Sequence, residues 1–278
     1  MQQKPMATIL DGTIIAEHMH ERIRARVDAL GVAPMLAAVS VGKNPAVEKF
    51  IAIKKKAAER CGILFSSYVL EDVSDASLRE TIAFLNADDE VTGIFLELPL
   101  PLGMDSSVCM DLIDPRKDVD VLTSQRRAMF HADPAGLVLL PPTVRALREV
   151  CELRGVVLPG MQCAVVGGGQ LVGEPVARWL QAQGAVVAVI DEYTKDPATI
   201  ASRADLIVSG VGKPKLITKK WIKEGATVID FGYALQKGKV VGDVDATSVA
   251  SLTDLLTPVP SGMGPIMVAA MLENLCEL

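Results

Sequence analysis

The chain has 278 residues, of which half are hydrophobic and 4% aromatic, and its formal net charge is −6. This length suits one large or two medium-sized domains with a large aliphatic core, while a pI near 5.2 argues against nucleic acid as the main partner. We find no internal repeat, no secretory signal and no apolar run long enough to span a membrane, so we expect a cytoplasmic protein.

The cysteines and histidines do not form a metal-binding or disulfide pattern. The five cysteines are scattered, odd in number and without a C-x-x-C pair, so we expect buried thiols in a reducing compartment. His18 and His20 are expected on a surface helix, and His131 stands alone. We therefore predict no metal site.

The first half of the chain alternates strands and helices after a lead-in over residues 1–8 that holds an early strand. Asn44 and Pro45 suit the start of a helix, and Gly62 suits the left-handed conformation after its end. The resulting βαβαβ order predicts a parallel sheet covered by helices. The expected strands are 34–41, 63–69 and 93–98, and the expected helices are 12–30, 44–60, 74–86 and 105–114.

The second half begins after an irregular segment expected over residues 115–142. A linker between domains is expected within residues 141–159, because prolines flank a helix over 143–154. The expected strands beyond it are 162–166, 186–190, 206–210, 227–231 and an edge strand 240–244, and the expected helices are 171–184, 197–202, 219–222 and 266–276.

A glycine-rich turn between the strand at 162–166 and the next helix is the strongest single motif. Gly167, Gly169 and Gly173 form G-x-G-x-x-x-G, one residue longer than the usual dinucleotide fingerprint, with Gly168 inside the turn. Glycines let backbone approach a phosphate, and the following helix N-terminus attracts an anion. The alternative is a glycine-rich turn that binds nothing.

The end of the next strand carries two acids, Asp191 and Glu192. An acid about 20 residues beyond the glycines suits the ribose hydroxyls of an adenosine and repels a 2′-phosphate. No Arg or Lys lies within residues 167–172 or 187–193 to neutralise such a phosphate. These residues favour NAD over NADP.

Candidate acid–base residues lie in the first half. Phe50 and Lys54 are four apart on one helix and share a face, where apolar neighbours can desolvate the lysine and lower its pKa. The alternative is a lysine that extends to solvent. Glu97 ends a parallel strand, where ligands bind, or is an ordinary acid at a strand end.

Two loops complete the candidate site. Asp118 and Asp120 follow Pro115 and can hold a polar ligand, or cap a helix or turn. The Pro/Gly-rich loop at 257–265 brings backbone close to a ligand, or forms a rigid connection between domains.

Together these motifs resemble the bifunctional methylenetetrahydrofolate dehydrogenase/methenyltetrahydrofolate cyclohydrolase family. The motifs occur in the same order, as N-P-A…F-x-x-x-K at 44–54, E-L-P-L-P at 97–101, K-D-V-D at 117–120, G-x-x-x-L-V-G-x-P at 167–175, A-D-L-I-V-S-G-V-G-K-P at 204–214, G-D-V-D at 242–245 and T-P-V-P-S-G-M-G-P at 257–265. The resemblance implies two α/β domains around a cleft. It places a folate-binding catalytic domain at 1–145 with a returning helix 263–278, and a Rossmann-like domain at 146–262.

The resemblance also implies an activity and its residues. 5,10-Methylenetetrahydrofolate is oxidised by a nicotinamide dinucleotide, usually NADP, and the methenyl product is hydrolysed to 10-formyltetrahydrofolate by an enzyme that is usually a homodimer. The implied catalytic residues are Lys54, Glu97 and Asp120, of which Asp120 also holds the pterin. The implied substrate-binding residues are Phe50, Leu98, Pro99, Asp120, Pro260 and Gly262. Taking the glycine motif and the resemblance together, the predicted dinucleotide-binding residues are Gly167, Gly168, Gly169, Gly173, Asp191, Gly210, Val211 and Gly212.

Several positions depart from the family pattern. Phe50 replaces a tyrosine, Glu97 a glutamine and Val121 a glycine, while Gly168 and Gly169 replace an arginine and a serine. A Glu97–Lys54 pair favours the charged lysine and hinders it as a base, unless Glu97 takes over proton transfer. Two alternatives therefore stay open: a dehydrogenase without cyclohydrolase activity, and a non-catalytic paralogue that binds dinucleotide or folate.

Overall fold

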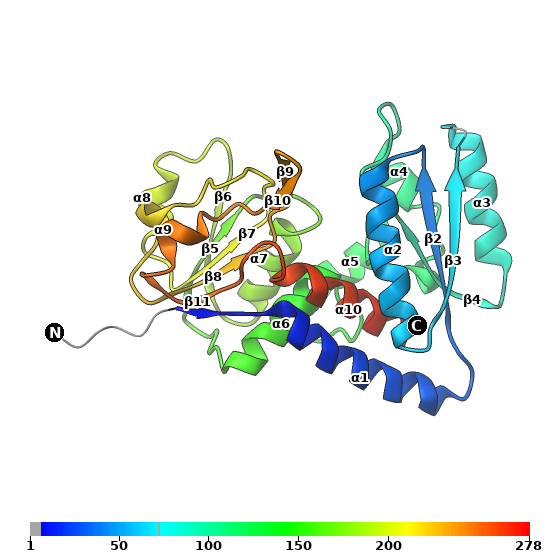
Figure 1. Cartoon of the computed structure of the whole chain (residues 1–278), viewed down its shortest axis with the longest axis horizontal. Helices are drawn as coiled ribbons and strands as arrows, with labels where there is room; N and C mark the ends of the chain where they lie inside the picture. The colour runs from blue at the N-terminus through cyan, green and yellow to red at the C-terminus, as the bar shows by residue number, and fades with distance from the viewer. Residues whose placement is uncertain (1–6, 72) are drawn as a thin grey trace. The chain divides into compact units, whose positions relative to one another are not determined.

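The computed structural model describes residues 7–71 and 73–278, which divide into two compact units (Figure 1). One unit comprises Glu17–Pro142 and Val268–Leu278, and we call it the lysine unit after Lys54. The other comprises the residues up to Ala16 and Thr143–Met267, and we call it the glycine unit after its glycine-rich turn. Of the lead-in expected over residues 1–8, residues 1–6 lie outside the described residues, and β1 (Thr8–Ile9) is the early strand.

A parallel three-stranded sheet forms the centre of the lysine unit. Its middle strand is β2 (Met35–Val41), flanked by β3 (Leu64–Leu70) and β4 (Val91–Leu96). The connections run through α2 (Pro45–Arg60) and α3 (Asp75–Ala87), which confirms the βαβαβ order. Four consecutive β2 side chains, residues 36–39, are fully buried, as expected of an aliphatic central strand covered on both faces.

The ends of α2 and α3 follow the capping residues in the sequence. Asn44 Oδ1 accepts a hydrogen bond from the Ala46 amide at 3.0 Å, and Ser74 Oγ accepts one from the Ser77 amide at 3.2 Å. Gly62 has φ +75° directly after the α2 C-cap, which confirms its predicted left-handed conformation.

The remaining helices of the lysine unit include one that the sequence pattern did not predict. Residues 115–142 contain a 3₁₀ turn (Pro115–Lys117) and α5 (Ser124–Ala132), so the prediction of an irregular segment was wrong. Because α5 buries a single side chain, Phe130, its apolar periodicity is weak. The helix expected over 105–114 is the shorter α4 (Ser106–Met110).

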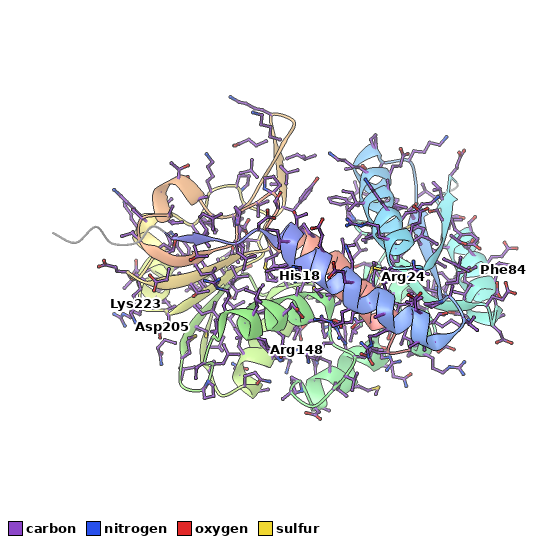
Figure 2. The ribbon with its side chains drawn as sticks, turned by 60° about the horizontal axis from the view of Figure 1, so that its bottom comes forward. His18, Arg24, Phe84, Arg148, Asp205 and Lys223 are labelled. Atoms are coloured by element: carbon purple, nitrogen blue, oxygen red, sulfur yellow. The ribbon has the colours of Figure 1, made fainter. Side chains whose placement is uncertain are left out.

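Helices α1 (Gly12–Leu30) and α10 (Met263–Leu275) meet through polar contacts in the lysine unit. Arg22 Nε donates to Glu273 Oε1 at 3.0 Å. His18 is exposed (Figure 2). His20 is half-buried on the same helix, and among the described residues its two buried ring nitrogens have no hydrogen-bond partner. Burial lowers the pKa of His20 and favours its neutral form.

The glycine unit contains a parallel six-stranded sheet in the order β1-β11-β8-β7-β5-β6. Its strands after β1 are β5 (Gln162–Val166), β6 (Val186–Ile190), β7 (Leu206–Ser209), β8 (Ala226–Asp230) and β11 (Thr253–Leu256). Its helices are α6 (Pro142–Arg154), α7 (Gly173–Ala182), α8 (Pro197–Ala201) and α9 (Ala246–Val249). The strand order reverses at β5, and ligands of such sheets bind beyond the carboxyl ends of the strands at that point.

Several details of the glycine unit differ from the sequence prediction. The segment expected as an edge strand over 240–244 forms β10 (Lys239–Val241), which pairs with β9 (Ala234–Gln236) in a separate hairpin. Lys237 and Gly238 both have positive φ, so the local turn chemistry rather than the main sheet defines this hairpin. The residues expected as a helix at 219–222 form only a 3₁₀ turn (Lys219–Trp221).

The five cysteines are free thiols, and four of them are buried. Burial raises the pKa of Cys61 to about 11 and those of Cys151 and Cys163 to about 12, so these thiols stay protonated near neutral pH. Among the described residues no group of three or more His, Cys, Asp and Glu is placed to hold a metal ion. No helix in that part of the chain is both long and apolar enough to cross a membrane.

Candidate active site

Lys54 and Glu97 form an ion pair at the carboxyl end of β4. Lys54 lies on α2, and its Nζ donates to Glu97 Oε2 at 2.5 Å. Glu97 directly follows β4, and its amide donates to Val39 O at 2.8 Å. This hydrogen bond to β2 fixes the backbone from which the Glu97 side chain extends. The Lys54 side chain is 19% exposed and the Glu97 side chain 7%, so the ion pair is largely removed from solvent. A partly desolvated pair of this kind can exchange a proton with a bound ligand.

The lysine also lies over an aromatic ring. Nζ of Lys54 is 4.3 Å from the centroid of Phe95, which is a cation–π contact. Phe95 precedes Glu97 by two residues at the end of β4, so their side chains share a face. Sequence analysis missed Phe95, although this two-residue spacing was the signal that could have found it.

Asp120 lies within electrostatic range of the ion pair. Burial raises its pKa to about 6, and the charges of Asp118 and Glu97 act in the same direction, while Lys54 opposes them. Lys54, Glu97 and Asp120 thus form one electrostatically coupled group. A carboxyl group that titrates near neutrality can accept a hydrogen bond or move a proton.

The other polar residues of the K-D-V-D loop have local roles. Lys117 Nζ donates to Leu85 O at 3.0 Å and Asp88 O at 2.6 Å, at the end of α3. Asp118 is 1% exposed and accepts from the amides of Asp120 at 3.1 Å and Thr123 at 2.8 Å. Asp118 therefore fixes the turn that presents Asp120.

The same loop contains a strained residue and is held by the C-terminal helix. Val121 has φ +58°, a conformation that is costly for a β-branched side chain. Asn274 Nδ2 donates to Val119 O at 2.8 Å and to Leu140 O at 2.7 Å. These contacts hold the loop where Val121 occupies the position of the family's glycine.

Three predicted folate-binding positions lie close to this group in sequence. Phe50 precedes Lys54 by one helical turn on α2. Leu98 packs against the apolar core beneath the sheet, and the Leu98–Pro99 peptide bond is cis. These residues border Lys54 and Glu97 along the chain, which is where the sequence analysis placed a substrate.

The glycine turn lies between β5 and α7. A Cβ atom on Gly173 would lie 1.8 Å from Gly167 O, so only glycine permits this approach of helix to turn. Gly167 itself has φ +99°. A Cβ atom at Gly168 or Gly169 would meet almost nothing, so space lies beside these two residues. The helix expected from residue 171 begins at Gly173 without a side-chain cap. The Glu174 amide donates to Gly169 O at 3.0 Å and Pro175 has no N–H, so α7 would attract an anion mainly through the positive end of its dipole.

Asp191 lies at the end of β6, as the fingerprint requires. Its Oδ1 accepts from Thr194 Oγ1 at 2.7 Å and from the Tyr193 amide at 3.0 Å, and these hydrogen bonds lower its pKa. The carboxylate is exposed and stays ionised at neutral pH. Its position suits the ribose of a bound dinucleotide.

The other predicted ligand residues of the glycine unit lie on two tight loops. Gly210 leaves β7, and a Cβ atom there would lie 2.5 Å from Val172 Cγ1, while Val211 and Gly212 follow it. Pro260 follows a cis peptide bond, and a Cβ atom on Gly262 would lie 2.2 Å from Pro258 O. Both loops are close-packed backbone, as expected of segments that approach a ligand.

The polar cluster at the opposite edge of this sheet is structural. Lys223 Nζ lies 2.5 Å from Asp205 Oδ1 (Figure 2). Asp205 precedes β7 and Lys223 precedes β8, so this pair lies at the amino ends of the strands. Ligands of parallel sheets bind at the carboxyl ends, so we assign the pair no role in binding.

The glycine cradle at the end of β5 defines the glycine unit as a dinucleotide-binding domain of the Rossmann class. Residues 141–278 match the family model described as tetrahydrofolate dehydrogenase/cyclohydrolase, NAD(P)-binding domain, and residues 10–120 match that of the catalytic domain. The chain belongs to the tetrahydrofolate dehydrogenase/cyclohydrolase family, which confirms the resemblance drawn from its motifs.

Individual relatives agree with this assignment. The bifunctional protein FolD of Roseiflexus sp. (strain RS-1) is 38% identical over 274 residues, which cover 96% of this chain and 94% of that protein. The bifunctional enzyme FolD of Campylobacter jejuni is 33% identical, with a TM-score of 0.93 and 98% of each chain covered. The Trypanosoma brucei methylenetetrahydrofolate dehydrogenase-cyclohydrolase, solved with NADP and an inhibitor, is 31% identical, with a TM-score of 0.93 and 98% of this chain and 97% of that chain covered.

Proposed function

We propose that this chain oxidises 5,10-methylenetetrahydrofolate with a nicotinamide dinucleotide and hydrolyses the methenyl product to 10-formyltetrahydrofolate. The observation that carries the proposal is the coupled group of Lys54, Glu97 and Asp120 in a chain of this family. Lys54, Glu97 and Asp120 are the proposed catalytic residues. Phe50, Leu98 and Pro99, with Pro260 and Gly262 of the glycine unit, are proposed to contact the folate.

The first step needs mainly binding and orientation. Asp120 accepts hydrogen bonds from the pterin, and Phe50 stacks on the aminobenzoyl ring. A bound nicotinamide would supply the acceptor for the hydride of the one-carbon bridge, and loss of that hydride leaves the substrate as a methenyl cation. The charged Lys54 polarises the nitrogen next to this carbon.

The second step needs proton transfer. Water attacks the methenyl carbon, and one of its protons passes to Glu97. The carbon–N5 bond then breaks as the remaining hydroxyl proton is transferred to N5, which leaves the formyl C=O on N10. Lys54 holds the Glu97 carboxylate at 2.5 Å and orients it toward the water. In this scheme Glu97 supplies the base that a charged lysine cannot supply.

The glycine unit fits a dinucleotide on its own geometry. The Gly167–Gly173 contact brings helix α7 to the turn, and open space lies beside Gly168 and Gly169. These two residues, with the α7 N-terminus, would hold the pyrophosphate. Gly210, Val211 and Gly212 would border the nicotinamide end, and Asp191 would bind the ribose.

We propose NAD as the preferred dinucleotide. The exposed Asp191 carboxylate would repel a 2′-phosphate, and neither Gly168 nor Gly169 offers a side chain to bind one. Glu192 adds a second exposed acid next to it. The relative from Trypanosoma brucei was solved with NADP, so a direct comparison of the two cofactors is needed.

We also propose a homodimer in a reducing compartment such as the cytoplasm. Strand β6 is an edge of the six-stranded sheet, and Val186 and Val189 are 56% and 46% exposed there. An open apolar strand edge suits pairing with a second copy. Four cysteines that are buried as free thiols, Cys61, Cys109, Cys151 and Cys163, favour the reducing compartment. Light scattering should give twice the monomer mass, and Val189→Lys should shift it toward the monomer.

The test of the main proposal uses purified protein with 5,10-methylenetetrahydrofolate and either NAD or NADP. Reduced nicotinamide and methenyltetrahydrofolate are followed together by absorbance. We expect reduction with NAD to exceed that with NADP, followed by decay of the methenyl signal faster than in buffer. No reduction of either cofactor would favour a non-catalytic paralogue.

The substitution Glu97→Gln tests the hydrolytic half separately. If Glu97 is the base, this variant loses hydrolysis of added methenyltetrahydrofolate and keeps hydride transfer. An increase in hydrolysis would show that Glu97 only hinders Lys54. If wild type already hydrolyses no faster than buffer, the chain is a dehydrogenase without cyclohydrolase activity.

A further inference from the structure

Two buried carboxylates of the glycine unit lie outside the proposed catalytic group. Asp230 ends β8 and is 2% exposed, and Asp243 lies in the G-D-V-D segment and is fully buried. Neither forms an ion pair with a cation within residues 7–71 and 73–278. A buried carboxylate without a neighbouring cation is costly unless hydrogen bonds compensate its charge, and both carboxylates accept several such bonds.

Asp243 binds the loop that leaves β7. Its Oδ2 accepts from Ser209 Oγ and from the Val211 amide, and its Oδ1 accepts from the Lys213 amide, each at 2.7 Å. A carboxylate accepts on both oxygens, whereas an asparagine would turn an NH₂ group toward one of these donors. The charge of Asp243 is therefore matched to the backbone conformation of the loop at 210–213.

Asp230 holds Asp243 and a second loop. Its Oδ1 accepts from the amides of Gly232 at 2.7 Å and Asp243 at 3.2 Å, and its Oδ2 accepts from the Val244 amide at 2.9 Å. The Asp230 amide donates to Thr257 Oγ1 at 2.8 Å, at the start of the Pro/Gly-rich loop.

Two glycines let these carboxylates approach the backbone. A Cβ atom on Gly242 would lie 2.1 Å from Asp230 Oδ2, and one on Gly232 would lie 2.4 Å from Asp243 Cγ. The packing around the two carboxylates therefore requires glycine at both positions.

The loop that Asp243 binds packs directly on the glycine turn. A Cβ atom on Gly167 would lie 3.3 Å from Val211 Cγ1 and 3.4 Å from Gly210 O. Hydrogen bonds thus connect Asp243 to the loop at 210–213, and that loop borders the turn that would hold the pyrophosphate. A change at Asp243 is expected to reach the dinucleotide through this loop.

We propose that Asp243 is a positioning residue for the dinucleotide. Its hydrogen bonds fix the loop at 210–213 against the glycine turn, and Asp230 holds Asp243 in place. The inference rests on the proposed function, because it takes this loop as the border of the nicotinamide site. It assigns the G-D-V-D segment a role in cofactor affinity without contact with the cofactor.

The test compares Asp243→Asn with Val249→Ala, a matched variant that opens a cavity in the fully buried core of the same unit. The dissociation constant of NADH is measured by fluorescence, together with the KM values for NAD and for 5,10-methylenetetrahydrofolate and the melting temperature. For Asp243→Asn we expect the NADH dissociation constant and the KM for NAD to rise about tenfold, and the KM for the folate to change less than twofold. Val249→Ala should lower the melting temperature and leave the KM for NAD unchanged.

Equal effects of the two variants on NADH affinity, or no effect of Asp243→Asn, would overturn the inference. Should Asp243→Asn fail to fold, Ser209→Ala removes one donor to the same carboxylate and should raise the NADH dissociation constant about threefold. An unchanged constant in Ser209→Ala would then count against the inference. NADH binding is read without turnover, so a wild type that binds NADH but reduces neither cofactor contradicts the proposed function and leaves this test intact.

Discussion

The two units build their sites from different parts of the chain. In the lysine unit the chemistry lies in side chains, because Lys54, Glu97 and Asp120 form a coupled group of charges. In the glycine unit the cradle is backbone, because Gly167 and Gly173 approach each other more closely than any side chain would allow. The comparison teaches that proton transfer needs titratable groups, whereas phosphate binding needs access to N–H groups.

Substitutions should impair the side-chain site and the backbone site in different ways. A side-chain site can lose its chemistry while the fold survives, since another side chain can fill the volume. A backbone site loses binding when any atom is added at the point of close approach. Substitutions in each unit can therefore test this comparison.

The largest effect is expected from Lys54→Met. The variant keeps the length of the side chain but removes the charge that holds Glu97, so hydrolysis of methenyltetrahydrofolate should fall about 10²–10⁴-fold. Binding of NADH, measured by fluorescence, should stay within twofold of wild type. Because Lys54→Met leaves a buried carboxylate unpaired, Lys54→Met/Glu97→Gln is the control that restores stability without activity. Hydrolysis above a tenth of the wild-type rate would show that the lysine is not catalytic.

The next largest effect is expected from Gly173→Ala. The added methyl group would lie 1.8 Å from Gly167 O, so helix α7 must move. We expect a loss of about 1–3 kcal/mol in stability and a comparable loss in NADH binding. Gly264→Ala is the matched control, because its methyl group meets no atom within 4 Å and Gly264 is not among the proposed dinucleotide-binding residues. Equal losses in both variants would contradict a cradle defined by the Gly167–Gly173 contact.

The sequence predicted local features better than distant pairings. Asn44 and Gly62 mark the ends of α2 through hydrogen bonds and dihedral angles within a few residues, so the local sequence was sufficient. Helix α5 was missed because its only buried side chain is Phe130, which leaves no apolar stripe. Strand β11 was missed because its short segment, T-D-L-L, carries almost no period-two pattern.

In the candidate site, too, the sequence predicted single residues better than contacts between residues that are distant in the chain. Lys54 and Glu97 were both predicted as candidates, but 43 residues separate them and only the fold brings them to 2.5 Å. The hydrogen bond between Ser209 and Asp243 spans 34 residues and carries no local signal. Sequence analysis therefore identified the chemical groups, and the structure supplied their partners.

A double substitution in the glycine unit tests which of its side chains select the cofactor. Gly168→Arg with Asp191→Ser adds a cation and removes an anion, and a Cβ atom at Gly168 meets only Val189 Cγ1 at 3.9 Å. We expect the ratio of kcat/KM for NADP to that for NAD to rise about 10–100-fold, since hydrogen bonds to a charged group such as a 2′-phosphate contribute about 1.5–3 kcal/mol. The melting temperature should fall only slightly, because neither substitution fills occupied space and Asp191→Ser loses only exposed hydrogen bonds to Tyr193 and Thr194. A ratio that stays at the wild-type value would contradict the assignment of Asp191 to the ribose.

The smallest change in activity is expected from pH. The pH dependence of kcat/KM for the folate tests the side-chain site in the wild-type protein. The pKa of Asp120 is about 6, so its ionised fraction, and with it kcat/KM for the folate, should be halved near pH 6 and about tenfold lower at pH 5. The native carboxyl group holds its proton more tightly than the unfolded chain does, where the pKa is near 3.8. Wild type should therefore lose stability relative to Asp120→Asn as the pH rises from about 4 to 6, and the difference should be constant above that range.

Asp230 provides the competing interpretation of that profile. Burial raises its pKa to about 6 as well, although it lies in the glycine unit among backbone amides. Asp120→Asn separates the two groups, because the acid limb of kcat/KM for the folate should disappear if Asp120 carries it. A limb that persists near pH 6 in Asp120→Asn, with the KM for NAD rising in parallel, would instead assign the titration to Asp230. Protonation of Asp230 would then alter dinucleotide binding by moving the backbone that its carboxylate holds. The glycine unit would in that case also depend on a titratable side chain, as the lysine unit does.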